Sequence, residues 1–172
     1  MRYSKAILCF AIAFILGTCF SQEAFSSNIR KQKLEKLVSS YSKASGFHAE
    51  KLGTFGVFGV KAMIHSYAKN VHDPRVGDFL KLVDGVEKVV ILQYASGSDS
   101  DRKGFDTQMN RLLKSVEPVM TVSYMGASMK VYVVYDDSGR LLEDVILYSP
   151  DASLLACLYG HMPVESMQNL TK

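Results

Sequence analysis

The sequence predicts an α+β fold, with a largely antiparallel sheet of five to six strands and helices packed on one face. The strongest observation is the region after Pro118, where short runs of β-branched and aromatic residues alternate with tight turns. Before that point, apolar residues recur mostly at helical spacing. The turns are too short for the crossover connections of parallel strands, so the C-terminal strands are expected to form an antiparallel meander.

The first expected helix runs from Ile29 to about Lys43, and a linker follows it as far as Gly53. The glycine-rich run 53–59 lacks the lysine and hydroxyl residue of a phosphate-binding loop. We interpret it as a strand whose glycines allow close backbone approach. A helix is then expected over 61–69.

The middle of the chain is expected to contain two further helices around a strand. Pro74 begins a helix that ends at Gly85, because proline is favoured in the first helical turn. The β-branched run Val86–Tyr94 is interpreted as a mostly buried strand. A loop over Ser96–Gly104 then leads into an amphipathic helix, Phe105–Val116.

Four strands and a short helix complete the expected fold. The strands are Val119–Tyr124, Lys130–Tyr135, Leu141–Tyr148 and Ser153–Tyr159. Lys130–Tyr135 is nearly continuous in β-forming residues, which favours a central position in the sheet. Pro163 is expected to open a last helix that runs to about Leu170.

The N-terminus has the pattern of an export signal. Arg2 and Lys5 precede an uninterrupted apolar run, Ala6–Leu16. This run has the length of a signal-peptide core, and it is shorter than the roughly 20 residues that span a bilayer. Small residues then permit cleavage after Ser21, so residues 1–21 are expected to be a signal peptide.

Two alternatives to soluble release remain open. Leu16-Gly17-Thr18-Cys19 resembles the lipobox of bacterial lipoproteins, in which the cysteine is acylated. The threonine before Cys19 departs from the usual small residue of that motif. The second alternative is that the apolar segment stays uncleaved as an anchor.

Length and charge indicate one domain that does not bind nucleic acid. A chain of 172 residues fits a single domain. After the leader we expect an N-terminal helix and linker (22–53), and then the α+β domain itself (54–172). The net charge of +3 falls to +1 when Arg2 and Lys5 are removed with the leader. A near-neutral domain lacks the basic surface that phosphate backbones require.

Several segments together resemble the exported bacterial family known as domain of unknown function 4252. They share a pattern of apolar residues between about Phe55 and Leu170, and they are Val57–Met63, Val89–Leu92, Leu112–Ser115, Met129–Tyr135, Leu142–Leu147, Leu154–Met162 and Val164–Leu170. The resemblance implies a signal peptide or lipoprotein signal and one α+β domain. It also implies a Gram-negative cell envelope of the Bacteroidota type, in the periplasm or at the outer membrane. It implies no enzymatic activity, ligand or catalytic residue.

The sequence contains no clear catalytic or metal-binding motif. The four histidines (His48, His65, His72 and His161) match no metal-ligand spacing, and we expect each at the surface. No metal or other cofactor is therefore expected. Cys157 and His161 are the sharpest candidate pair, since a thiolate and an imidazole can act as a nucleophile and its base. The apolar run around Cys157 favours a small buried side chain instead.

Three polar segments are interpreted as turns. Asp136-Asp137-Ser138-Gly139 and Asp99-Ser100-Asp101 lack the alternating ligands and distal glutamate of a calcium loop. Ser128 follows one glycine but lacks the second glycine of a nucleophile elbow, so we place it in a hairpin turn.

The sequence therefore favours a non-enzymatic binding or interaction module of the cell envelope. Its partner is expected to be another envelope protein, and membrane contact is expected only through lipidation at Cys19. A hydrolase or thiol enzyme that uses Cys157 and His161 is the alternative. An enzyme requires a cleft with converging titratable groups, whereas a binding module presents an apolar surface patch.

Overall fold

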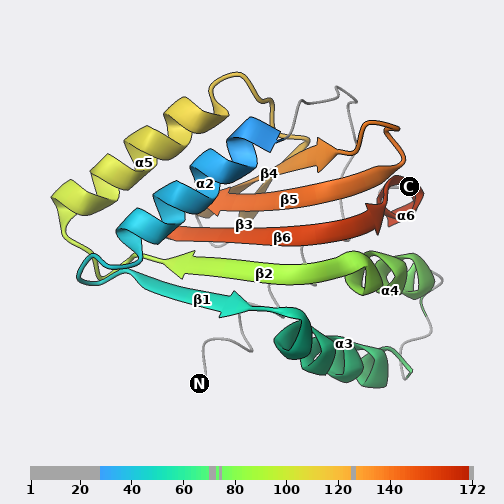
Figure 1. Ribbon diagram of the computed structural model, residues 1–172. Helices are drawn as coiled ribbons and strands as arrows, with labels where there is room; N and C mark the ends of the chain where they lie inside the picture. Colours follow the sequence, from blue (N-terminus) through green and yellow to red (C-terminus); the bar gives the residue numbers. More distant parts are fainter. Residues whose placement is uncertain (1–27, 70–72, 74, 125–126, 171–172) are drawn as a thin grey trace.

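The computed structural model describes residues 28–69, 73, 75–124 and 127–170 (Figure 1). One sheet of six strands has the order β1-β2-β6-β5-β4-β3, and every neighbouring pair is antiparallel. The strands are β1 (His48–Leu52), β2 (Val86–Gln93), β3 (Met120–Tyr124), β4 (Ala127–Tyr135), β5 (Leu141–Ser149) and β6 (Leu154–Pro163). The described helices are α2 (Asn28–Tyr41), α3 (Thr54–Ala68), α4 (Val76–Gly85), α5 (Asp99–Leu113) and α6 (Val164–Leu170). The α+β class and the C-terminal meander are confirmed.

The meander occupies one side of the sheet, and β2 and β1 extend it past β6. The segment Lys130–Tyr135 lies within β4, which is paired with β3 on one side and β5 on the other. The middle of the sheet is formed by β5 and β6, so the expectation that Lys130–Tyr135 is central was wrong by one position. A run of β-forming residues indicates burial, which a strand next to the edge can also have.

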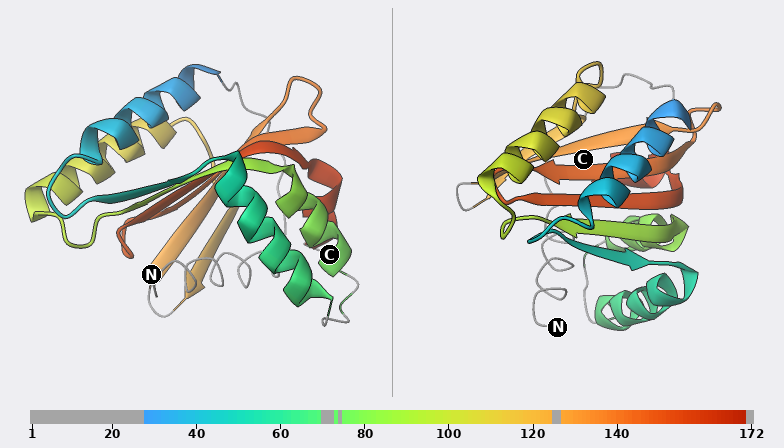
Figure 2. Two further views of the ribbon diagram at one scale, coloured as in Figure 1. Left: turned by 60° about the horizontal axis from the view of Figure 1, so that its bottom comes forward. Right: turned by 60° about the vertical axis from the view of Figure 1, so that its left-hand side comes forward.

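Helices cover both faces of the sheet, which corrects the expectation of helices on one face (Figure 2). The α2/α5 face includes Tyr132, Ile146 and Cys157, which lie in one core cluster with residues of α2 and α5. Alternate residues of the same strands form a second cluster with α4, α6 and Val57 of α3. The physical reason is that Val131–Tyr135 is buried at every position, so both of its faces need cover.

The segment between α2 and α4 differs most from expectation. His48–Leu52, expected in a linker, is the edge strand β1 and pairs with β2. The glycine-rich run, expected as a strand, is the first half of α3. Because α2 contributes Leu34, Leu37 and Val38 to the core, residues 28–53 belong to the same folded unit as the rest.

The helix α5 begins six residues before the expected Phe105. Ser98 caps it: its hydroxyl accepts a hydrogen bond from the Asp101 amide at 3.1 Å. The Ser98 hydroxyl also donates to the Asp101 carboxylate at 2.6 Å. A serine followed three residues later by an acid is a capping signal, so the loop expected over Ser96–Gly104 ends at the cap.

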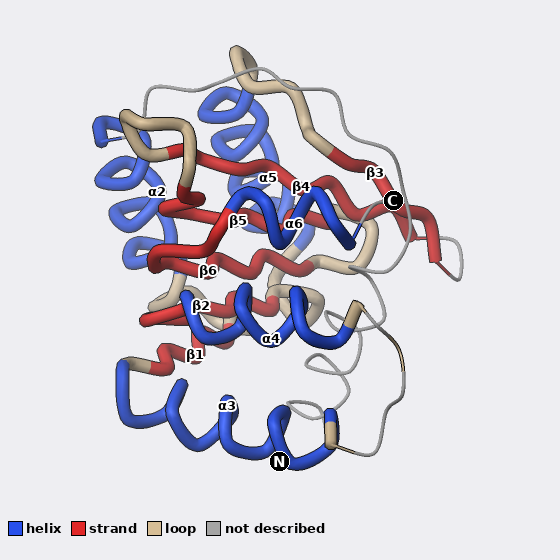
Figure 3. Tube along the Cα trace, turned by 90° about the vertical axis from the view of Figure 1, so that its right-hand side faces the viewer, coloured by secondary structure: helices blue, strands red, loops and turns tan. Residues whose placement is uncertain are grey.

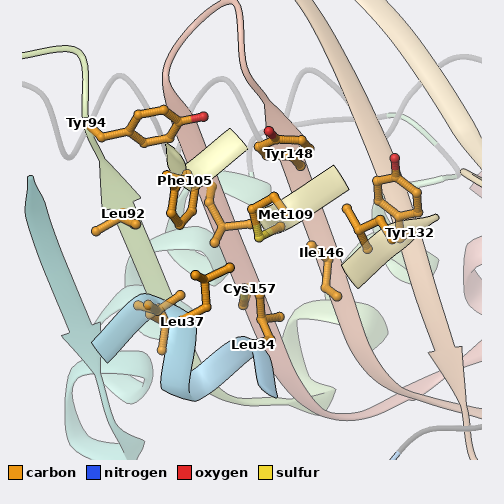
Figure 4. Close-up of a cluster of buried hydrophobic side chains, with 14 of the residues drawn as sticks. Leu34, Leu37, Leu92, Tyr94, Phe105, Met109, Tyr132, Ile146, Tyr148 and Cys157 are labelled. Atoms are coloured by element: carbon orange, nitrogen blue, oxygen red, sulfur yellow. The ribbon is translucent and has the colours of Figure 1, made fainter. Parts of the chain in front are cut away.

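Polar and aromatic contacts hold α5 on the sheet. The hydroxyls of Tyr94 and Tyr148 both donate to Asp106 Oδ1, at 2.7 Å and 2.8 Å. The rings of Phe105 and Tyr94 are 4.8 Å apart between their centroids. Figure 4 shows Tyr94, Phe105 and Tyr148 among the side chains of this cluster. Two buried hydroxyls are thus satisfied by one carboxylate.

Residues 1–21 and the possible lipidation site Cys19 lie outside the described residues. No helix among the described residues is long and apolar enough to cross a membrane.

Candidate functional site

A groove of about 390 Å³ lies between α2 and the strands β1, β2 and β6. Polar and charged side chains line most of it, and Val38, Val90 and Tyr159 supply its apolar part. Its lysines come from three elements: Lys36 on α2, Lys51 on β1 and Lys88 on β2.

Ion pairs and an aromatic ring link α2 to the strands at this groove. Lys88 Nζ lies 3.0 Å from Glu35 Oε1. The ammonium groups of Lys31 and Lys88 lie 5.0 Å and 5.1 Å from the centroid of the Tyr159 ring. Both distances are within the range of cation–π attraction. Lys31 and Lys88 therefore connect α2 to the sheet.

Asp144 on β5 is the buried acid of this network. Its side chain is 4% exposed, and its Oδ1 atom lies 3.3 Å from Lys31 Nζ. That oxygen has no hydrogen-bond partner among the described residues, so we regard the contact as an ion pair without hydrogen-bond geometry. Burial raises the pKa of the Asp144 carboxyl, and the charge of Lys31 lowers it in part.

Cys157 lies beneath α2 and is fully buried (Figure 4). Figure 4 places it close to Leu34, among the apolar side chains of the α2/α5 face. Burial raises the pKa of the Cys157 thiol to about 12. At neutral pH the group is therefore a thiol, and it fills space as a small apolar side chain.

His161 lies in different surroundings from Cys157, although both belong to β6. Its side chain is 63% exposed, and its Nδ1 atom lies 3.0 Å from Glu87 Oε1. Glu87 sits at the register shift between β2 and β6, next to Gly160. The structure thus gives His161 a carboxylate partner at the surface and leaves Cys157 in the core, so it separates the two residues of the candidate pair.

The other histidines are dispersed. His48 is exposed on β1. His65 on α3 lies 2.8 Å from Asp84 Oδ1 on α4. His72 lies outside the described residues. Within the described part of the chain, no group of three or more His, Cys, Asp or Glu side chains could hold a metal ion.

The acidic segments have structural partners. Asp136 Oδ1 accepts from the amides of Arg140 and Leu141, both at 2.9 Å. Hydrogen bonds from the Ser138 hydroxyl and from backbone amides lower the pKa of Asp136. Gly139 has φ +69°, so this segment is a tight turn.

Asp99 and Asp101 lie in the first turn of α5, where acids favour the helix N-terminus. Ser128 is a strand residue paired with Ser123, which corrects its expected place in the turn. Its amide donates to Asp151 Oδ2 at 3.0 Å, and its carbonyl accepts from the Ser149 hydroxyl at 2.8 Å. Ser128 therefore joins β4 to the turn between β5 and β6.

A second candidate surface is the outer face of α3, which the sequence interpretation missed. The exposed large apolar side chains of the described residues all belong to this helix: Phe55 is 95% exposed, Phe58 72% and Met63 37%. Val57 and Ile64 point to the other side and are buried. The helix is therefore apolar on two opposite faces, and only one of them packs on the domain.

Two polar contacts join α3 to α4. Lys61 Nζ donates to the Asp84 carbonyl at 2.7 Å, and His65 pairs with the Asp84 carboxylate. The helix that bears the apolar outer face thus also contacts α4.

Comparisons with known proteins give no match: no family model, curated protein or solved structure matches this chain. The resemblance to domain of unknown function 4252 therefore stays a prediction.

Proposed function

We propose that this chain is an exported cell-envelope protein that acts as a non-enzymatic interaction module, and that the outer face of α3 is its binding surface. The observation that carries the proposal is the exposure of Phe55, Phe58 and Met63 on one helix. Contiguous exposed apolar surface is costly in water, and on soluble domains it marks interaction sites.

The groove beside α2 supports this proposal indirectly. Two of the charged residues that line it, Glu35 on α2 and Lys88 on β2, pair with each other across the groove. This pair connects α2 to the sheet, and a group held in such a contact is less available to act on a substrate.

Site-specific photo-crosslinking in the intact envelope tests the binding surface. A benzophenone amino acid replaces Phe58, and in a matched control it replaces Asn110, which is exposed on α5. We expect a discrete crosslinked protein product from position 58 and none from position 110. Equal products from both positions, or none from position 58, would refute the assignment of α3.

Mass spectrometry of the N-terminus tests the export part of the proposal. A mature chain that begins after Ser21, or an acylated Cys19, supports export by either route. An intact Met1 in a cytosolic protein would refute it.

A further inference from the structure

We infer that the outer face of α3 binds the same face of a second copy of this chain, in an antiparallel pair of helices related by a two-fold axis. This inference rests on the proposed function, because it names the partner of the same surface. It is carried by the pattern of side chains along the helix.

The outer face of α3 is a stripe of six exposed residues at helical spacing. The stripe consists of Phe55, Phe58, Gly59, Ala62, Met63 and Ser66. Residues three and four positions apart lie on one side of a helix, so these six form one continuous surface. Large residues stand at one end and along the flanks, and small residues stand in the middle.

The stripe is complementary to itself under a two-fold axis. If the axis passes between Val60 and Lys61, each stripe residue faces another stripe residue of the second copy. Gly59 then faces Ala62 where the helices are closest, Phe58 faces Met63 at the flanks, and Phe55 faces Ser66 at the ends. An isologous interface requires this property, because the same patch must serve both subunits.

The size of each pair suits close packing. Gly59 and Ala62 let the two helix backbones approach, as small residues do at close helix contacts. A Cβ atom added to Gly59 would have no neighbour within 4 Å in its own chain, so the space over this residue is open. Phe58 and Met63 would then cover each other beside the line of contact.

The position of α3 leaves room for a second copy. Figure 3 shows α3 beyond the edge strand β1, at the end of the molecule away from β3. Of the described elements, α3 packs mainly against α4, β1 and β2. An approaching helix therefore meets the stripe before it meets the rest of the domain.

The area predicts a weak, reversible dimer. Phe55 and Phe58 expose about 330 Å² per copy if a phenylalanine offers about 200 Å². With the rest of the stripe, two copies approach the roughly 1,000 Å² at which specific interfaces begin. We expect a dissociation constant on the order of 10 µM.

Sedimentation equilibrium tests the inference on protein purified from its native cell, with the N-terminus processed as it is there. The wild type is expected to dimerise reversibly. Phe58→Lys places a charge in the contact and is expected to weaken it at least about tenfold. Asn110→Lys adds the same charge on α5 and is expected to match the wild type. Circular dichroism checks that each variant is folded.

The variant Gly59→Leu distinguishes binding of a second copy from binding of another apolar partner. The leucine adds apolar area to the stripe but keeps the two backbones apart. We expect weaker dimerisation by about tenfold or more, whereas a lipid surface would bind this variant more tightly. A wild type that stays monomeric up to hundreds of micromolar, or a Gly59→Leu variant that dimerises as well as the wild type, would overturn the inference.

Crosslinking tests the register. When Phe58→Cys and Met63→Cys chains are mixed under mild oxidation, the mixed disulfide is expected to form faster than either symmetric one. Equal rates would refute the proposed axis. The photo-crosslinking experiment separates the two proposals: a foreign protein on position 58 upholds the interaction module and overturns the dimer, and absence of any product overturns both.

Discussion

Lys31 on α2 lies over Asp144 on β5, with 3.3 Å between the ammonium nitrogen and Oδ1. Asp144 is the buried charged residue of the described chain, and Lys31 is its cationic partner. The pair joins the first described helix to the middle of the sheet.

Removing the lysine is expected to cost more than removing both groups. Lys31→Met leaves a buried carboxylate without a partner, which should lower the free energy of unfolding by about 1–3 kcal/mol. The double variant Lys31→Met/Asp144→Asn should recover most of that loss. Urea unfolding at pH 7 measures both, with the exposed Lys33→Met as a control. Additive losses in the double variant would show that the two residues do not interact.

The pH dependence of the free energy of unfolding should reveal the raised pKa of Asp144. Burial raises the pKa of this carboxyl above its ordinary value of 3.8, so the folded chain holds the proton more tightly than the unfolded chain. The stabilising contribution of the protonated group is present below pH 3.8 and is lost as the pH rises through the raised pKa. Asparagine does not ionise. The stability of Asp144→Asn relative to wild type should therefore increase between about pH 3 and pH 7.

Urea unfolding of both proteins at several pH values checks this expectation. Curves that stay parallel across the range would mean that Asp144 has no raised pKa. A wild type that gains on the variant as the pH rises would mean that the ion pair with Lys31 outweighs burial.

The elements that were predicted correctly depend on local sequence. Turn residues and runs of β-forming residues define the meander, as in β4 and the turn at Gly139 that follows it. The helix α5 was predicted too short, although Ser98 and Asp101 form a recognisable cap. The sequence also contains a sign that the sheet is covered on both faces. Val131 and Tyr132 are consecutive apolar residues, and both are buried.

The remaining features depend on contacts that local sequence does not encode. The polar strand β1 exists because it pairs with β2, for example Glu50 with Ile91. The Glu35–Lys88 pair spans 53 positions and follows from the placement of α2 on the sheet. The run around Phe58 has glycines and apolar residues on all sides, so its periodicity does not separate a strand from a helix.

Cys157 should resist thiol reagents in the folded protein. Its pKa of about 12 leaves little thiolate at pH 8, and its side chain is fully buried. Labelling of the peptide that contains Cys157, followed by mass spectrometry, should therefore proceed only at the rate of unfolding. The exposed variant Asn110→Cys serves as a control and should label at once. Fast labelling of native Cys157 would revive the thiol-enzyme alternative.

Gly160 should tolerate no side chain, because it passes directly beside Gly85. A Cβ atom on Gly160 would lie 2.0 Å from the Gly85 carbonyl oxygen, and its φ of +155° disfavours other residues. Gly160→Ala is therefore expected to lower the free energy of unfolding by about 2–4 kcal/mol, since the backbone of α4 or β6 must move.

Gly77→Ala is the matched control, because a Cβ atom there has no neighbour within 4 Å and the residue lies in α4. It should leave stability unchanged or raise it by up to about 1 kcal/mol, because alanine is the better helix former. Urea unfolding compares the two variants with the wild type. Equal changes in both variants would show that the close approach of Gly160 to Gly85 does not limit the packing of α4 on β6. The register shift between β2 and β6 beside His161 would then depend on another contact.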